Sequence, residues 1–236
     1  MKTRKTLLAA ALGAGLLSAT GAHAALELTL GGQGVYDTDL NITWLADANL
    51  AASNTFGVSG ISNGYLDWNT AQSWIGAMNA ANHLGFNDWR LPTVTDIGAP
   101  GGSGSWYDGT GDYFYNVTSS EMGHLYYTEL GNLGVYSTSG VPQPGYALKN
   151  TGPFSNFMLY DAYWSGTEYA PDTDRAWSFG MYYGSQAWNH KLNTLRAWAV
   201  RDGGASVSAV PEPETYAMLL AGLGLLGFTA RRRSRS

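Results

Sequence analysis

The chain of 236 residues contains no cysteine. Disulfide bonds, thiolate catalysts and cysteine metal sites are therefore excluded, and the fold has to be stabilised by core burial without covalent links. Aromatic residues and glycine are plentiful instead, with nine Trp, fifteen Tyr and thirty-one Gly. Because large aromatic side chains bury much apolar area and Gly allows tight turns, we expect an aromatic core joined by many irregular loops.

Positive charge is scarce in the central part of the chain. Residues 25–209 contain six Lys and Arg against sixteen Asp and Glu, a net charge of −10, and the other seven basic residues lie at the two ends. Such a surface repels phosphate backbones and sulfated polymers, so we predict that nucleic acid is not a partner. Neutral glycans and cations remain possible ligands.

Apolar runs are short, and the first one follows the N-terminus. Lys2, Arg4 and Lys5 precede an apolar stretch from Leu7 to Leu17, and Ala-His-Ala, a small-x-small cleavage pattern, follows at 22–24. This three-part pattern predicts a secretory signal peptide over residues 1–24, with the mature protein beginning at Ala25. The alternative, a first transmembrane helix, is disfavoured because a bilayer core needs about 20 apolar residues.

The second apolar run lies near the C-terminus. Residues 211–214 read Pro-Glu-Pro-Glu, residues 216–230 are apolar and uncharged, and arginines follow. Because Lys and Arg clusters beside a membrane segment stay on the cytoplasmic side, we expect a short transmembrane helix with the body of the protein outside. The residues that we assign to sorting are Pro211, Glu212, Pro213, Arg231, Arg232 and Arg233.

This layout, over residues 210–236, resembles the PEP-CTERM sorting signal of Gram-negative bacteria. The resemblance implies recognition by an exosortase, a membrane transpeptidase that cuts near the Pro-Glu-Pro and passes the protein to the cell surface or the exopolysaccharide matrix. The protein would then be held in the membrane only transiently, through the C-terminal helix. An ordinary tail anchor is the alternative interpretation.

The remaining residues, 25–209, are enough for one domain with a sizeable core. Partial alternation over residues 26–50 indicates two strands joined by turns at 31–32 and 37–39. A helix is predicted over residues 69–82, capped by Asn69. Its core face follows helical spacing and consists of Ala71, Trp74, Ile75 and Met78.

The most specific internal string runs from Gly85 to Thr93. Pro92 disfavours helix at and just before its own position. An Arg among apolar residues needs a partner, so we predict that Arg90 fork-bonds a carboxylate and packs on an aromatic ring, while a ligand-facing Arg90 is the alternative. The residues that we assign to this structural motif are Gly85, Asp88, Trp89, Arg90, Leu91, Pro92 and Thr93.

Residues 85–93 match the Gly-x-x-Asp-Trp-Arg-Leu-Pro-Thr string of a bacterial surface domain, the Lcl C-terminal domain, a domain of unknown function. The central region resembles this family, with further matches at 43–49, 68–81 and 163–166, at Trp177 and Gly180, and at 199–201. One departure is Asp96-Ile97, where the family often has Glu-Leu, so a carboxylate is kept but its reach is shortened. The resemblance implies a single C-type-lectin-like α+β domain with a long irregular loop region and a terminal antiparallel sheet.

The sequence is compatible with that fold. Residues 98–125 are rich in Gly and are predicted to be loop. Residues 176–179 and 195–200 alternate roughly as two paired strands would, and residues 188–191 between them are expected near the hairpin turn.

Aromatic and polar side chains crowd this late hairpin and the loop before it. Aromatic faces stack on sugar rings, and Asn and Asp supply directed hydrogen bonds to hydroxyl groups. If Trp177 and Phe179 face inward, Tyr182, Tyr183 and Trp188 are the better candidates for exposure, although most Trp and Tyr in such a fold belong to the core. The candidate ligand-binding residues are Asp172, Asp174, Tyr182, Tyr183, Trp188 and Asn189.

Metal binding and catalysis are less well supported by the sequence. Paired aspartates at 172–174 and 108–112 offer oxygen ligands for calcium, but they also suit turns, and the Glu-Pro-Asn and Trp-Asn-Asp strings of calcium-dependent lectins are absent. We predict no metal and no cofactor. His83, His124 and His190 lack metal-ligand spacing, no nucleophile elbow is present, and the cysteine chemistry of the related formylglycine-generating fold is excluded.

We therefore predict an exported, non-catalytic module at the cell surface or in the extracellular matrix that binds carbohydrate or exopolysaccharide. Two alternatives stay open. One is a structural matrix protein without a defined ligand. The other is a glycan hydrolase that uses two carboxylates, because the separation that such a pair requires cannot be read from the sequence.

Overall fold

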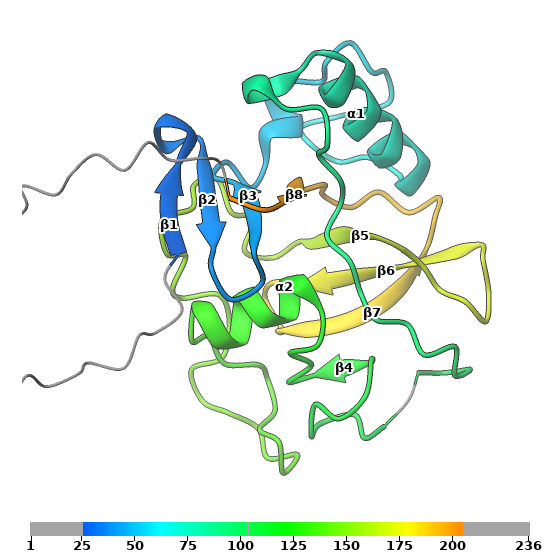
Figure 1. The fold of residues 1–236 in the computed structure, drawn as a ribbon. Coiled ribbons are helices and arrows are strands. Elements are labelled where there is room, and N and C mark those ends of the chain that lie inside the picture. The colour runs from blue at the N-terminus through cyan, green and yellow to red at the C-terminus, as the bar shows by residue number, and fades with distance from the viewer. Residues whose placement is uncertain (1–25, 103, 205–236) are drawn as a thin grey trace, which may run out of the picture.

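The computed structural model describes residues 26–102 and 104–204 (Figure 1). They form a mixed structure of helices and strands with two antiparallel sheets, so the prediction of combined α and β structure is confirmed. The predicted signal peptide, residues 1–24, and the predicted sorting helix, within residues 210–236, lie outside the described residues. In the described part, no helix has both the length and the apolar character to cross a bilayer.

The first sheet has the order β1-β2-β3-β8, with β1 at Leu26–Thr29, β2 at Gly34–Asp37, β3 at Ile42–Leu45 and β8 at Val200–Asp202. The prediction of two strands over residues 26–50 was wrong, because each of the two predicted turns reverses the chain and together they separate three strands. At the second turn, the Asp37 carboxylate accepts hydrogen bonds from the backbone N–H groups of Asp39 and Leu40.

The second sheet has the order β4-β7-β6-β5, with β4 at Phe114–Tyr115, β5 at Ala162–Glu168, β6 at Arg175–Gly180 and β7 at Ser185–His190. Residues 176–179 do not pair with residues 195–200, as was predicted, but with β5 and β7. Trp188 lies inside β7 opposite Trp177, so its predicted place near the turn was also wrong.

The turn between β6 and β7 falls at residues 181–184, earlier than expected, and Gly184 allows it. This residue has a φ of +63°, and a Cβ there would lie 2.8 Å from atoms of Tyr126 and Tyr127. Only glycine meets both conditions without strain. The turn is also anchored from outside, because the N–H of Val135 donates to the carbonyl of Tyr183 at 3.0 Å.

Helix α1 spans Trp68–Ala80 and buries Ala71, Trp74, Ile75 and Met78, which confirms the predicted core face. Its cap is Asp67 rather than Asn69. The Asp67 carboxylate accepts a hydrogen bond from the N–H of Thr70 at 2.7 Å. Because the helix begins one residue earlier than predicted, Asn69 falls within its first turn.

The remaining helical elements are short. Helix α2 spans Glu121–His124 and continues into one π-helical turn, Leu125–Glu129. Single 3₁₀ turns lie at Leu30–Gly32, Leu50–Ala52 and His83–Gly85. The region 98–125, predicted to be loop, is irregular for most of its length but contains β4 and the whole of α2. Helix α1 and strand β4 lie at opposite ends of the described body (Figure 1).

The core is aromatic, as expected for a chain without cysteine. Ring centroids of Trp44 and Trp198 lie 4.6 Å apart, and Phe154 packs edge-on against Trp198. Five tryptophans are fully buried, at positions Trp44, Trp74, Trp164, Trp177 and Trp198. Burial of such side chains is the main stabilising contribution available to this fold.

Candidate functional site

The motif segment, residues 85–93, is held by partners from several other elements. Trp89 is buried, its backbone N–H donates to the side-chain oxygen of Asn79 on α1, and its indole N–H donates to the carbonyl of His83. Asp88 accepts two hydrogen bonds from Arg201 on β8, at 2.9 and 3.0 Å. These contacts join α1, the motif segment and the first sheet.

Arg90 makes the predicted fork with a carboxylate. Its two terminal nitrogens donate to Glu121 on α2 at 2.8 and 2.7 Å, and a further ion pair reaches Asp202 at 2.6 Å. Burial alone would lower the pKa of Arg90, but the bonds to Glu121 and Asp202 outweigh it and raise that pKa. Next to it, the guanidinium of Arg201 lies over an aromatic ring of the motif segment, 3.9 Å from the centroid of Phe86.

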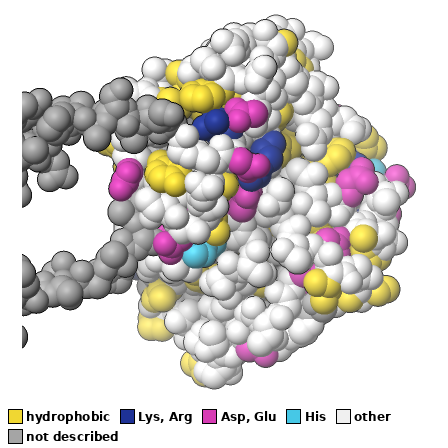
Figure 2. Space-filling model, viewed as in Figure 1, with side chains coloured by type: hydrophobic (Ala, Val, Ile, Leu, Met, Phe, Trp, Pro, Cys, Tyr) yellow, Lys and Arg dark blue, Asp and Glu magenta, His cyan; other side chains and the backbone are white. Residues whose placement is uncertain are grey.

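Most of the other basic side chains are also paired with carboxylates. Of the six Lys and Arg between residues 26 and 204, five form ion pairs with carboxylates: Arg90, Arg175, Lys191, Arg196 and Arg201. On the face shown in Figure 2, basic side chains lie directly beside acidic ones. The described surface therefore offers little free positive charge for a polyanion, in keeping with the charge of the sequence.

A groove lies on the face of the second sheet that carries Ser178 and Gly180. Its volume is about 210 Å³. The strands contribute small or polar side chains to its lining, and tyrosines from the neighbouring turns form its walls. We call it the tyrosine groove, and the residues that line it are Tyr160, Asp161, Ala162, Ser178, Gly180, Tyr182, Tyr183, Ser185, Ala187 and Asn189.

The walls of the tyrosine groove are exposed aromatic rings. Tyr160 is 77% exposed and Tyr183 is 52% exposed. The ring centroid of Tyr182 lies 4.9 Å from that of Tyr160 and 4.9 Å from that of Tyr183. A hydrogen bond with Tyr146, whose ring centroid is 5.4 Å from that of Tyr182, raises the pKa of Tyr182. The rings therefore form a contiguous aromatic wall at the edge of the groove.

The floor of the groove is polar and held in place. Asn189 donates its side-chain N–H to the hydroxyl oxygen of Ser178 at 2.8 Å, and that hydroxyl donates to the carbonyl of Ala187 at 3.1 Å. The side chain of Asn189 is thereby fixed in one orientation. Fixed donors and acceptors beside an aromatic wall are what directed hydrogen bonding to sugar hydroxyl groups requires.

The structure divides the six candidate ligand-binding residues among three places. Tyr182, Tyr183 and Asn189 line the tyrosine groove. Trp188 points to the opposite face of β7, where its ring centroid is 4.5 Å from that of Tyr113. Asp172 and Asp174 lie in the turn between β5 and β6, and Asp172 pairs with Arg175 at 2.9 Å.

Sequence reasoning missed two important residues of the groove, Tyr160 and Ser178. Tyr160 lies just before β5, outside the predicted hairpin. Ser178 carried a usable signal, because alternation with Trp177 and Phe179 places it on the other face of β6. The choice of small residues on that face, at 178, 180, 185 and 187, leaves the space that the groove occupies.

Other candidate positions serve local structure. The carboxylate of Asp108 accepts hydrogen bonds from the backbone and hydroxyl of Thr110, and that of Asp172 accepts one from the N–H of Asp174. Both are turn contacts. Two further hollows, one of about 270 Å³ beside Asp47 and His83 and one of about 340 Å³ beside Asn132 and Lys149, have no Trp, Tyr or Phe in their lining.

Comparison with known families finds one match. Residues 209–233 match the model of the PEP-CTERM protein-sorting motif. All the predicted sorting residues lie in this span: Pro211, Glu212, Pro213, Arg231, Arg232 and Arg233. No curated protein and no solved structure is similar enough to this chain to count as a match. The sorting signal is therefore confirmed as a motif, and it implies export and processing by an exosortase at the surface or the membrane.

Proposed function

We propose that the protein is an exported, non-catalytic module that binds a neutral polysaccharide in the tyrosine groove. The observation that carries the proposal is the combination of exposed, contiguous tyrosine rings with an oriented Asn189 on a floor of small residues. The sorting motif supports it, because a protein delivered to the cell surface meets extracellular polysaccharide there.

The size of the groove favours a polymer over an enclosed small ligand. Pockets that enclose small molecules usually have volumes of about 300–1,000 Å³, and this groove of about 210 Å³ is smaller and open. A polysaccharide could place one residue against the tyrosine wall while its neighbours continue across the surface. The negative net charge of the domain favours a neutral polymer over a sulfated or phosphorylated one.

The lining of the groove is a poor site for glycan hydrolysis. Its described lining contains one carboxylate, that of Asp161, which bonds to Arg196 at 2.9 Å and accepts the hydroxyl of Tyr65. A glycosidase of the usual kind needs two carboxylates across the scissile bond. A binding role therefore fits this site better than catalysis.

We further propose that the described domain is C-type-lectin-like and related to the Lcl C-terminal domain. Support comes from residues 85–93, which bond to α1 through the backbone of Trp89 and to α2 and β8 through the side chains of Arg90 and Asp88, as expected of a structural motif. Two antiparallel sheets, with long and mostly irregular segments between α1 and α2 and before β5, are compatible with such a fold.

Polysaccharide retention tests the groove. Full-length protein would be passed over immobilised dextran, over a β-glucan and over exopolysaccharide from the producing cells. We expect retention on at least one of the three and about tenfold weaker binding for the double variant Tyr160→Ala with Tyr183→Ala, since each aromatic contact contributes about 0.5–1.5 kcal/mol.

The matched control is Trp106→Ala. Trp106 is 56% exposed and stacks on Phe114, outside the groove. Equal weakening by Trp106→Ala, or wild-type retention by the double variant, would place the binding surface elsewhere. Absence of retention on all three polymers, with normal surface display, would favour the structural matrix role.

Deletion of residues 210–236 tests the sorting signal separately from the groove. We expect the shortened protein to be exported but lost from the cell surface, because the exosortase motif is gone. Surface labelling of intact cells measures this. Undiminished display of the shortened protein would contradict the sorting proposal without affecting the groove.

A further inference from the structure

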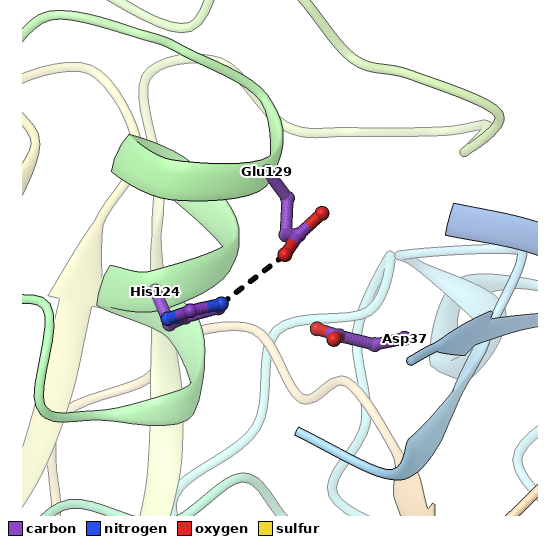
Figure 3. Close-up of side chains that lie close together, drawn as sticks. All are labelled: Asp37, His124 and Glu129. Carbon is purple, nitrogen blue, oxygen red and sulfur yellow. Dashed lines mark hydrogen bonds and ion pairs between the residues drawn. The ribbon is translucent and has the colours of Figure 1, made fainter. Parts of the chain in front are cut away.

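Three titratable side chains from distant parts of the chain converge beside the first sheet. Asp37 ends β2, His124 ends α2, and Glu129 ends the π-helical turn that follows. Figure 3 shows the carboxylates of Asp37 and Glu129 and the imidazole of His124 pointing toward one another. One potential ligand atom from each residue lies within 4.8 Å of the other two, and Nε2 of His124 is 3.1 Å from Oε1 of Glu129.

The Asp37 carboxylate has one oxygen in use and one without a partner. Its Oδ1 accepts the N–H groups of Asp39 and Leu40, whereas its Oδ2 is buried and has no hydrogen-bond partner among the described residues. Asp37 is fully buried as a residue. A buried carboxylate oxygen without a donor is costly, so this oxygen is suited to be the ligand of a cation.

The cluster places carboxylates beside one imidazole in a part of the fold that water reaches little. The side chain of Glu129 is 1% exposed and that of His124 is 18% exposed, so water screens them little. Asp39 adds a third carboxylate at the rim, with Oδ2 3.9 Å from Nε2 of His124.

We propose that Asp37, His124 and Glu129 bind a divalent transition-metal ion, with Zn²⁺ the best fit. Imidazole with carboxylates suits Zn²⁺, whereas Ca²⁺ and Mg²⁺ prefer oxygen ligands alone. Zn–N and Zn–O bonds of about 2.0–2.2 Å place ligand atoms about 3.3–3.5 Å apart in a tetrahedron, close to the 3.1 Å between His124 and Glu129. Asp39 or water takes the fourth position.

Such an ion would join two parts of the fold that are far apart in sequence, the end of β2 and the α2 segment. Closing a long loop with a metal restricts the unfolded chain, as a disulfide does in other exported domains. This chain has no cysteine with which to make that link. The role of the ion is therefore stabilisation, and it is independent of the tyrosine groove.

The test is metal binding to the full-length protein, purified with a tag that lacks histidine and stripped with a chelator. Calorimetric titration with ZnCl₂ should give one ion per chain, and Zn²⁺ should raise the thermal unfolding temperature by several degrees. CaCl₂ at the same concentration should have no such effect. The X-ray absorption fine structure of the zinc complex should show one imidazole and otherwise oxygen ligands.

Variants identify the ligands. His124→Gln and Glu129→Gln should weaken Zn²⁺ binding by about tenfold or more. The control His190→Gln removes an exposed histidine of β7 that lies outside the cluster and should bind as the wild type does. Without metal, Glu129→Gln should be at least as stable as the wild type, because it removes repulsion from Asp37.

The opposite results would overturn the proposal. If Zn²⁺ leaves the unfolding temperature of the wild type unchanged, or if the absorption spectrum shows no imidazole, the cluster is not a zinc site. If Glu129→Gln lowers the unfolding temperature of the metal-free protein and Zn²⁺ does not bind, His124 is instead a charged partner of the two carboxylates.

Discussion

The motif segment, residues 85–93, and the tyrosine groove both combine aromatic rings with polar side chains, but they use them in opposite ways. In the motif segment, Trp89 is buried and Asp88 and Arg90 are bonded to other parts of the chain. In the groove, Tyr160 and Tyr183 are exposed, and Asn189 is oriented on a floor of small side chains.

The difference shows how poorly a distinctive sequence string indicates a binding site. The string at 85–93 is distinctive because Asp88, Trp89 and Arg90 each bond to a particular partner elsewhere in the chain, and few other residues would fit. The groove depends on residues that are small or exposed, and such residues leave little trace in the sequence. Exposed polar and aromatic residues that make no contacts needed for the fold are better indicators of a binding site.

Substitution in the turn between β6 and β7, which carries Tyr182 and Tyr183 of the groove, should have the largest effect on stability. Gly184→Ala combines an unfavourable positive φ with a Cβ 2.8 Å from Tyr126 and Tyr127, so we expect about 3 kcal/mol of destabilisation in urea unfolding. Gly131→Ala is the control, because Gly131 has a similar φ of +61° and open space, and it should cost only about 1 kcal/mol. Equal losses would show that the contact with the two tyrosines is unimportant.

Arg90→Ala should have the second largest effect on stability, because it removes the ion pairs that hold the motif segment. It leaves Glu121, whose side chain is 14% exposed, without its bidentate partner. We expect a loss of about 2 kcal/mol, less than for a fully buried pair because Arg90 is 30% exposed. Arg90→Lys should recover only part of this loss, since Lys cannot form the fork. If Arg90→Ala left the free energy of unfolding unchanged, a ligand-facing role for Arg90 would be supported.

The Asp88–Arg201 pair should make a smaller contribution that depends on pH. The hydrogen bond from Arg201 lowers the pKa of Asp88 below its ordinary value of 3.8. The contribution is therefore present above that value and is lost as the pH falls through the lower, folded-state pKa. In urea unfolding, Asp88→Asn should cost less than about 1 kcal/mol at neutral pH, because Asp88 is half exposed, and the difference should disappear once the pH is below the folded-state pKa.

Tyr183→Ala should have the smallest effect on stability and would sharpen the comparison most. Its exposed ring makes few buried contacts, so we expect the free energy of unfolding to change by less than about 0.5 kcal/mol. Polysaccharide binding should weaken in the same variant. A stability loss above about 1 kcal/mol would show that this tyrosine wall serves the fold rather than a ligand.

Several features could be predicted from short segments of sequence. Ala71, Trp74, Ile75 and Met78 fall at helical spacing, and they form the buried face of α1. The fork formed by Arg90 was predicted because an Arg among apolar residues needs a carboxylate, although the sequence did not show which of sixteen acids would supply it.

Other features failed because they depend on pairing between distant residues. β7 reads Ser-Gln-Ala-Trp-Asn-His, which has little of the apolar alternation that marks a strand, and it forms because β6 and β4 pair with it. Trp188 was therefore placed at a turn when it packs beside Tyr113. The capping error at α1 was local, since Asp67 and Asn69 are both good capping residues.

The sequence by itself determined what acts through order and composition: the sorting motif at 209–233, the negative charge of the domain, the need for a core without disulfides, and the inward face of α1. Only the tertiary structure decided which side chains share a surface. Tyr160 meets Tyr182, and Asp37 meets His124 and Glu129, because strand pairing and helix packing bring together residues that no local pattern relates.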